Sequence, residues 1–427
     1  MRIAVVGSGI AGLSAAWLLS RQHEVVLFES GDHLGGHTHT HDVDIGGRSF
    51  AVDTGFIVCN PANYPLFTGM LAELGVQTQP TTMTFALRNE RSGLEYNAGN
   101  RGGMFLQKRR ALSIRHWRMI LDILRFYRQA PRLLEAAGDG PSLGEYLDAG
   151  RYSAGFRDDH IVPMASALWS SPSEQILRFP AKYLAAFMAN HHMLQVDRRP
   201  QWQVVKGGSR SYVGAMARDW TAQHRLRTPV RGIRRHARGV DVATDSGSEE
   251  FEQVVLACHS DQALALLTDP SERESAILGA MGYQRNETVL HTDASQLPRD
   301  RRAWAAWNAI VPAQPDAQCT VSYCMNLLQS LDSPEPLVVT LNRSAAIDPN
   351  KILRRLVYHH PIYTRASVAA QARRAEINGV DRTWFCGAYW GWGFHEDGMR
   401  SGVEVAAALG VAWQPGAAPA RQAASIP

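Results

Sequence analysis

The chain has 427 residues and a mass of 47.1 kDa, with 45% hydrophobic and 20% charged residues. This composition excludes a wholly disordered chain and is enough for two packed domains. The net charge of +4 at pH 7 is small for this length and gives no indication of nucleic-acid binding.

The first thirty residues have the pattern of one β-α-β unit. Residues 2–7 form an apolar, β-branched run that is typical of a buried parallel strand. A helix is expected from the next turn to about Leu19, and residues 23–29 form a second buried strand that ends in Glu29. A strand, a helix and a second strand in this order are typical of a nucleotide-binding fold.

The turn between the first strand and the helix is glycine-rich and has the spacing G-x-G-x-x-G, over Gly7, Ser8, Gly9, Ile10, Ala11 and Gly12. Gly7 allows the tight turn, Gly9 lets the backbone approach a pyrophosphate, and Gly12 lets the helix pack closely on the strand. The helix N-terminus offers free N–H groups to phosphates, and Glu29 can accept hydrogen bonds from ribose hydroxyls. We therefore expect an adenine dinucleotide here.

Residues 108–135 form a basic segment with helical spacing. Ile114, Trp117, Leu121 and Leu124 recur on one stripe, and residues 108–132 contain eight basic residues against one acid, Asp122. One interpretation places the charges in solvent and the apolar stripe in the core. The other places the segment on an anionic membrane, from which a lipid chain would pass to the cofactor. A second helical region follows residue 180, so we expect a helical insertion over about 108–195.

Beyond residue 202 the pattern returns to short strands. Residues 202–209 end a strand and open a helix after two glycines, and residues 225–260 give several short strands that finish in a buried one. Further strands are expected within 288–343. A last strand at 383–386 leads into Gly387 and a final helix from about 398 to 409. The sequence therefore predicts an α/β fold in which a parallel sheet is interleaved with a mixed sheet.

Three separated segments resemble the flavin amine oxidase superfamily, which includes monoamine oxidases, phytoene desaturases and protoporphyrinogen oxidase. The first is the opening unit with its Gly35-Gly36 doublet, after which His37 replaces the family's arginine. The second is Pro229-Val230, similar to the site where a valine backbone reads the adenine ring. The resemblance covers nearly the whole chain in order, and it matches closely only in these FAD segments.

The third segment spans residues 384–402. It is similar to the family's Phe-Ala-Gly turn and the helix that points its N-terminus at the flavin, with Asp397 where the family has glycine and Phe394 where monoamine oxidases have a cage tyrosine. The resemblance implies a Rossmann-type FAD domain like that of glutathione reductase. It would comprise residues 1–60, 203–280 and 381–413, with a substrate domain at 61–202 and 281–380 and a disordered tail at 414–427.

The resemblance implies noncovalent FAD, because no cysteine lies in a recognisable flavin-linking motif. The residues implied to bind it are Gly7, Gly9, Ile10, Ala11, Gly12, Glu29, Ser30, Gly35, Gly36, His37, Val230, Gly387, Phe394, His395, Glu396 and Gly398. His395, Glu396 and Trp392 are the candidates for catalysis at the flavin edge. For Glu396 the alternative is a helix N-terminal or ribityl contact. Trp390 and Trp392 could wall a substrate tunnel beside the flavin, and the alternative for them is core packing.

Residues 202–209 and 384–402 resemble, more narrowly, bacterial FAD-binding proteins related to the oxidase-like N-terminal part of plant cyclopropane fatty acid synthases. This resemblance implies an FAD-dependent oxidoreductase or isomerase that takes a hydride from a fatty acyl or membrane lipid substrate to flavin N5. The alternatives are a flavin amine oxidase, and a noncatalytic FAD-bearing partner of a lipid-modifying methyltransferase.

The histidines and cysteines are the candidate metal ligands and disulfide partners of the chain. His37, His39 and His41 alternate as on one strand face, but we interpret them as polar loop positions and expect no metal. The cysteines, five in number and scattered, argue against a disulfide framework and favour a reducing cytoplasm. No apolar run is long enough to span a bilayer. We therefore expect a cytoplasmic protein that either stays in solution or lies on the inner membrane surface.

Overall fold

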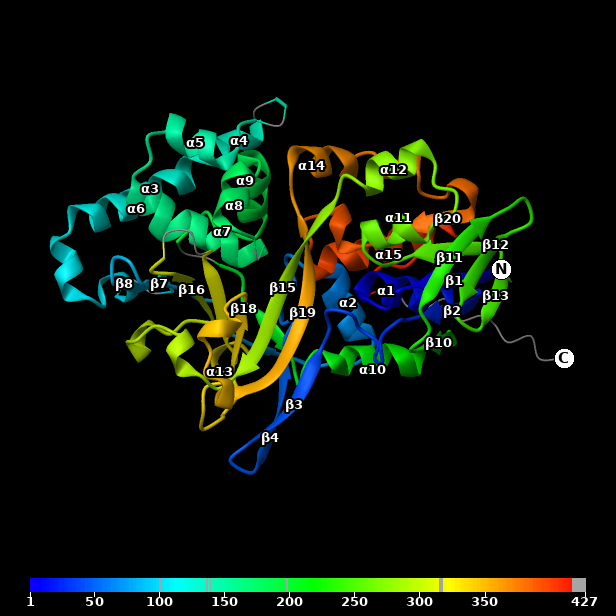
Figure 1. Cartoon of the computed structure of the whole chain (residues 1–427), viewed down its shortest axis with the longest axis horizontal. Coiled ribbons are helices and arrows are strands. Elements are labelled where there is room, and N and C mark those ends of the chain that lie inside the picture. The colour runs from blue at the N-terminus through cyan, green and yellow to red at the C-terminus, as the bar shows by residue number, and fades with distance from the viewer. Residues whose placement is uncertain are drawn as a thin grey trace.

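A parallel sheet around the first β-α-β unit forms one end of the molecule (Figure 1, right). The computed structural model describes residues 1–99, 102–135, 137–138, 140–169, 171–196, 199–314 and 318–416. All neighbouring strands of this sheet run parallel, in the order β10-β2-β1-β14-β20. Its strands are β1 (Arg2–Val6), β2 (Glu24–Phe28), β10 (Gln223–Arg225), β14 (Gln253–Leu256) and β20 (Thr383–Phe385). Segments far apart in the chain therefore share one sheet, as the sequence predicted.

Helix α1 (Ile10–Leu19) is buried along its whole length. It packs against α15 (His395–Ala408) and α10 (Arg210–Asp219). A Cβ on Gly12 would lie 1.9 Å from the carbonyl oxygen of Gly7, and one on Gly402 would lie 2.4 Å from that of Ala11. Both glycines are therefore required by close packing, because any side chain would collide with backbone.

A mixed sheet of seven strands forms the second layer, in the order β19-β15-β18-β17-β16-β7-β8. The pair β16–β7 is parallel and the other pairs are antiparallel. Its strands are β7 (Phe85–Asn89), β8 (Leu94–Asn97), β15 (Gly282–His291), β16 (Trp307–Val311), β17 (Thr320–Cys324), β18 (Val338–Leu341) and β19 (Ile352–Ile362). The predicted α/β class with one parallel and one mixed sheet is thus confirmed.

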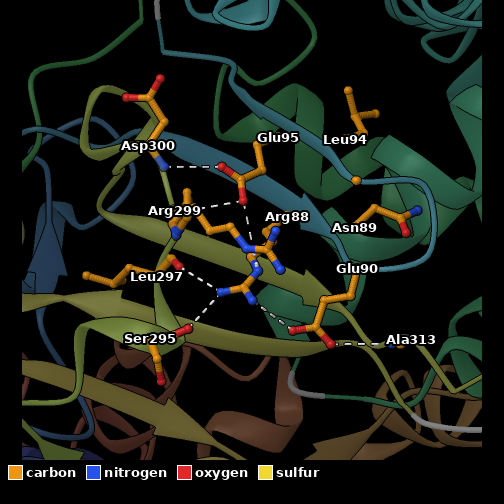
Figure 2. Close-up of polar contacts among 12 residues, drawn as sticks. Arg88, Asn89, Glu90, Leu94, Glu95, Ser295, Leu297, Arg299, Asp300 and Ala313 are labelled. Carbon is orange, nitrogen blue, oxygen red and sulfur yellow. Dashed lines mark hydrogen bonds and ion pairs between the residues drawn. The ribbon is translucent and has the colours of Figure 1, made fainter.

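The β7–β8 hairpin at the edge of this sheet is held by a charged network (Figure 2). Arg88 donates to the carbonyl oxygens of Ser295 at 2.7 Å and Leu297 at 3.1 Å, and pairs with Glu90 at 3.2 Å. Glu95 accepts from two backbone N–H groups that follow Leu297. Burial lowers the pKa of Arg88. These bonds fasten the hairpin to the segment that follows β15.

Helices between β8 and β9 form a separate layer (Figure 1, upper left). After the short η2 (Lys108–Leu112), they are α3 (Ile114–Gln129), α4 (Arg132–Glu135), α5 (Leu143–Ala149), α6 (Ala154–Phe156), the π-helical turn η3 (Arg157–Ile161), α7 (Val162–Trp169), α8 (Ser173–Arg178) and α9 (Ala181–Asn190). They share a core of aromatic and aliphatic side chains with the β7–β8 edge. No helix in the described residues is long and apolar enough to cross a membrane.

The apolar stripe that the sequence shows on α3 lies on the solvent side, so the interpretation that it packs in the core is wrong. Ile114 and Leu121 are exposed. A second set at the same spacing, which includes Met119, Ile123 and Phe126, is buried instead. Because both sets repeat with helical periodicity, the spacing alone cannot tell which one faces the core.

Smaller elements connect the layers. The strands are β3 (Thr40–Ile45), β4 (Arg48–Asp53), β5 (Val58–Cys59), β6 (Thr78–Pro80), β9 (Gln203–Val205), β11 (Val230–Arg235), β12 (Val240–Thr244) and β13 (Gly247–Phe251), and the helices are α2 (Pro65–Glu73), α11 (Ser260–Leu266), α12 (Glu272–Leu278), α13 (Met325–Leu328) and α14 (Arg365–Gln371). The final helix, α15, begins at His395 rather than at 398, because the Asp397 carboxylate accepts from the N–H groups of Trp392 and Phe394 and caps it. Residues 417–427 of the expected tail lie outside the described residues.

Candidate functional site

A cavity of about 500 Å³ runs from the glycine-rich turn after β1 to the helical layer. Gly7, Gly9 and Glu29 line it at one end, and Tyr127 and His160 line it in the helical layer. The cavity therefore joins the carboxyl edge of the parallel sheet to the helical insertion. The carboxyl edge is the part of such a sheet where dinucleotides bind.

The end of the cavity at the parallel sheet has the features of a dinucleotide cradle. The Glu29 carboxylate accepts from the N–H of Ser8 at 2.9 Å and that of Gly31 at 2.7 Å, which fixes it at the cavity wall. Gly9 is the N-cap of α1 and supplies no side-chain acceptor, so the first N–H groups of that helix stay free for an anion. A Cβ on Gly9 would meet nothing within 4 Å and would project into open space.

Histidines surround the middle of the cavity. His37, His259 and His360 line it, and their rings lie near one another, with His37 5.5 Å from His360 and 6.2 Å from His259 between ring centroids. Burial lowers the pKa of His37 to about 4 and that of His360 to about 3, so both are neutral at pH 7. The buried Nε2 of His37 has no partner in the structure. It is a free polar group on the cavity wall that a ligand can bond.

The N-terminus of α15 forms the next part of the wall. His395 stacks on Phe56 at 3.6 Å, and its Nε2 shares a hydrogen bond of 2.7 Å with the hydroxyl of Tyr212. Burial lowers the pKa of His395 well below its usual value, so it is neutral. The N-terminal turn of α15 therefore brings no histidine charge to the cavity.

The structure separates the three candidates for catalysis. His395 and Trp392 line the cavity, whereas Glu396 does not. The Glu396 carboxylate accepts from the backbone N–H groups of Leu66 at 2.9 Å and Phe67 at 3.0 Å, at the start of α2. This geometry is the helix N-terminal contact that was the alternative for Glu396. Trp390 also lies away from the cavity, packed beside the core of the parallel sheet.

Most of the residues implied to bind FAD come together on this cavity. Those that line it are Gly7, Gly9, Ile10, Ala11, Glu29, Ser30, Gly35, Gly36, His37, Gly387, Phe394 and His395. Four others, Gly12, Val230, Glu396 and Gly398, lie outside the lining. Gly12 and Gly398 pack against neighbouring elements instead, since a Cβ on Gly398 would meet Ile10 at 2.7 Å. With its fixed carboxylate, free helix N–H groups and unfilled glycine wall, the cavity fits a flavin dinucleotide.

The half of the cavity in the helical layer is apolar and aromatic. Its wall includes Met83, Phe85, Met164, Leu168, Trp169, Phe187, Trp392 and Phe394. Phe187 and Phe394 stack with 4.9 Å between ring centroids. Among the described residues that line the cavity, the only side chains of charged type besides histidines are Glu29 and Arg199. The two lie in opposite halves, since Arg199 acts on Tyr127 of α3, where its charge partly offsets the burial that raises the pKa of that phenol.

The sequence reasoning missed lining residues from two sources. Ala257, Cys258 and His259 follow β14, which pairs with β1, so the rule that parallel strands meet at one carboxyl edge would have found them. The helical contributions, such as His160 and Arg199, had no such signal. His160 lies in a π-helical turn that no periodicity marks, and Arg199 is one arginine among many.

Metal ligation is not indicated. In the described part of the chain no three His, Cys, Asp or Glu side chains are arranged to hold a metal ion. His39 stacks on His33 at 4.1 Å and lies 4.0 Å from His41, whereas His37 turns toward His259 and His360. The three histidines that alternate in the sequence therefore do not converge.

Comparisons with known proteins agree with this geometry. The family model of flavin-containing amine oxidoreductases matches residues 10–292. A candidate flavin-containing monoamine oxidase of Mycobacterium tuberculosis, AofH, is 29% identical over 285 residues, which are 63% of this chain and 59% of that protein. The aligned part thus spans about three fifths of the length of this curated relative.

Solved structures of two different enzymes share the fold. The CLA-producing fatty acid isomerase from P. acnes superposes with a TM-score of 0.70 at 15% identity, covering 96% of this chain and 99% of that one. Putrescine oxidase bound to putrescine superposes with a TM-score of 0.69 at 16% identity, with the same coverage. At such identities these likenesses show the architecture alone.

Proposed function

The chain belongs to the family of flavin-containing amine oxidoreductases, whose cofactor is FAD, and from that premise we propose an FAD-dependent oxidoreductase or isomerase that acts on fatty acyl lipids. The substrate would be an apolar chain with an anionic head group. Bound FAD supplies the hydride acceptor at N5. The substrate would lie in the apolar half of the cavity.

One observation carries this proposal, namely the lining of that apolar half. A primary amine is bound as an ammonium, which calls for a carboxylate or an aromatic cage. The only carboxylate among the described lining residues is Glu29, in the dinucleotide cradle. The resemblance implies that Phe394 takes the place of a cage tyrosine of monoamine oxidases. The wall around it is made mainly of Met, Leu, Phe and Trp side chains, with the His191 ring 5.8 Å from that of Phe394. Such a wall suits a hydrocarbon chain and excludes water from it.

A head-group subsite at the far end supports an anionic substrate. Arg199 and Tyr127 line the cavity there, and the Arg199 charge partly offsets the burial that raises the pKa of Tyr127. His160 lies beside them, with Nδ1 2.9 Å from the Tyr96 hydroxyl and a buried Nε2 that has no partner. Burial lowers the pKa of His160 to about 3, so it stays neutral. A guanidinium and a phenol together suit a carboxylate.

The residues near the cradle have supporting roles in this proposal. The N-terminus of α15 lies at the cavity wall, where Phe394 and His395 line it, and neutral His395 adds no charge there. Among the described lining residues, Cys258 is the only thiol, and it lies beside Gly7 in the dinucleotide cradle, where a Cβ on that glycine would meet its N at 3.1 Å. We therefore propose that FAD is bound noncovalently.

Anaerobic mixing of the FAD-loaded protein with linoleate, and separately with benzylamine and putrescine, tests the proposal. We expect linoleate either to bleach the visible flavin band or to emerge with displaced double bonds, which mass spectrometry of the products detects. Neither amine should bleach the flavin. Bleaching by an amine alone would overturn the proposal in favour of an amine oxidase. A flavin that stays oxidised with unchanged linoleate would favour the noncatalytic partner of a lipid-modifying methyltransferase.

A further inference from the structure

The outer face of η2 and α3 carries an apolar stripe that no other part of the described chain covers. Leu112 is 90% exposed, Ile114 78%, Leu121 61%, Trp117 46% and Leu124 42%. Five large apolar side chains thus face solvent within thirteen residues of one helical segment. Exposed hydrophobic residues that gather in this way mark a binding surface rather than the scatter found on any protein.

This outer stripe is not needed to attach α3 to the protein. The opposite face already packs into the helical core through Met119, Ile123 and Phe126. Ser113 caps the helix N-terminus by accepting from the N–H of His116. The segment is therefore ordered by its inner face, and the outer face remains available for a partner.

Positive charge borders the stripe. Residues 108–132 contain eight basic residues and one acid, a local net charge of +7, which exceeds the +4 of the whole chain. Two of the arginines pair with aspartates, Arg115 with Asp159 and Arg125 with Asp122. No carboxylate of the described residues pairs with the five other exposed cations, Lys108, Arg109, Arg118, Arg128 and Arg132. The stripe therefore lies in a field that attracts an anionic surface.

Trp117 has an environment that is typical of tryptophan residues at a membrane interface. Its indole Nε1 donates to the carbonyl oxygen of Ala111 at 2.8 Å, so the one polar group of the ring is satisfied inside the protein. Its ring lies 5.0 Å from that of Phe105. The rest of the indole can enter an apolar layer without leaving an unpaired N–H behind.

We propose that the outer face of residues 108–132 docks on the surface of an anionic lipid bilayer, with Ile114, Trp117 and Leu121 in the acyl boundary and the free cations among the lipid head groups. A second copy of the chain is disfavoured as the occupant, because a two-fold contact would bring two such charged faces together. An amphipathic segment with an apolar stripe bordered by Lys and Arg lies in the interface plane and does not span the membrane.

The docked segment also forms part of the cavity wall. Tyr127 of α3 lines the cavity from the inner side, whereas Leu121 and Leu124 of the same helix lie on the outer side. Docking would therefore bring the head-group end of the cavity to the membrane. The docking itself does not depend on the proposed substrate, so the two proposals can fail independently.

Sedimentation of the FAD-loaded full chain with vesicles tests the docking. One set of vesicles is phosphatidylcholine alone, and the other contains phosphatidylglycerol as well. We expect binding to the anionic set only, weakening as salt is raised because exposed charges are screened. The double substitution Ile114→Ser with Leu121→Ser should reduce the bound fraction about tenfold or more. Charge removal by Arg109→Gln, Arg118→Gln and Arg128→Gln should do the same.

The matched control is Val357→Ser with Val380→Ser, two exposed valines elsewhere on the surface at 43% and 47% exposure. This control should bind like the wild type. The melting temperature of every variant should stay unchanged, because all four apolar positions are exposed. Equal binding to both vesicle sets, or equal loss in the control, would overturn the proposal. So would sedimentation analysis in which the Ile114 and Leu121 substitutions dissociate an oligomer, since the stripe would then be an interface between copies.

Discussion

Helices α1 and α3 are both rich in apolar residues, and the structure uses them in opposite ways. Every residue of α1 is buried, because the parallel sheet lies on one side and α15 and α10 on the others. In α3 only His116, Met119, Ile123 and Phe126 are buried, while a second apolar stripe faces solvent. Apolar content thus indicates burial where a helix is enclosed by other elements. At the edge of a molecule it can indicate a binding face instead.

The largest difference in stability is expected between a substitution on the inner face of α3 and one on its outer face. Phe126→Ala removes a fully buried ring and should lower the free energy of unfolding by about 3–5 kcal/mol. Leu121→Ala, on the outer face, should change it by about 0.5 kcal/mol or less. Urea unfolding of both variants measures the difference. A similar loss of unfolding free energy in both variants would mean that the outer stripe is packed. Helix α3 would then not differ from α1 in how its apolar residues are used.

Substitutions at two glycines of the dinucleotide turn, Gly12 and Gly9, separate a packing role from a role in cofactor binding. Gly12→Ala places a Cβ 1.9 Å from the carbonyl oxygen of Gly7 and should cost about 3 kcal/mol of stability. Gly9→Ala meets nothing within 4 Å, so the fold should tolerate it, but the methyl group enters the dinucleotide cradle. We expect FAD affinity to fall about tenfold or more, which is about 1.4 kcal/mol.

Unfolding of the apoproteins and titration with FAD separate these two effects. If Gly9→Ala binds FAD as tightly as the wild type, the cradle is not where the pyrophosphate lies.

The buried carboxylate at the start of α15 predicts a pH dependence of stability. Burial raises the pKa of Glu396 from 4.5 to about 7, so the folded chain holds a proton there that the unfolded chain has lost. Stability should therefore fall as pH rises from 4.5 to about 7, and no further above that window. Glu396→Gln should remove a stability change of about 3 kcal/mol across this window.

The control for this prediction is Glu404→Gln, an exposed carboxylate on the same helix, which should leave the slope intact. Parallel pH profiles for wild type and Glu396→Gln would show that Glu396 is not the group that titrates.

The smallest effect concerns the far end of the cavity. Arg199→Ala should weaken oleate binding about tenfold, because a hydrogen bond to a charged group is lost. Methyl oleate, which has no carboxylate, should bind the wild type and the variant equally. Perturbation of the flavin spectrum on titration measures both ligands without turnover, and Arg199→Lys should recover part of the oleate affinity. An equal loss for the ester would assign Arg199 to packing rather than to head-group recognition.

Much of the cofactor half follows from local patterns. The spacing of Gly7, Gly9 and Gly12, with Glu29 at the end of the next strand, predicts a β-α-β unit, and that unit is present with those residues at its turn. The rule works because each residue acts on its immediate neighbours. Glu396 shows the limit of such patterns, because its partners are two amides of α2, more than three hundred residues earlier in the chain.

Helical periodicity in the sequence does not predict which residues of the helical layer line the cavity. His160 and Arg199 reach the cavity only through the way η3 and the segment after α9 pack around it. Neither residue lies in a motif, and each is one of many of its kind.

The sequence by itself determined the α/β class, the dinucleotide turn and the family, because these depend on short-range spacing and on strands whose apolar content buries them. Only the tertiary structure decided which face of α3 is exposed, where Glu396 points, and which side chains close the far end of the cavity. The physical reason is that burial is set by what packs against a segment. A stripe of apolar residues has the same period whether it meets a protein core or a bilayer.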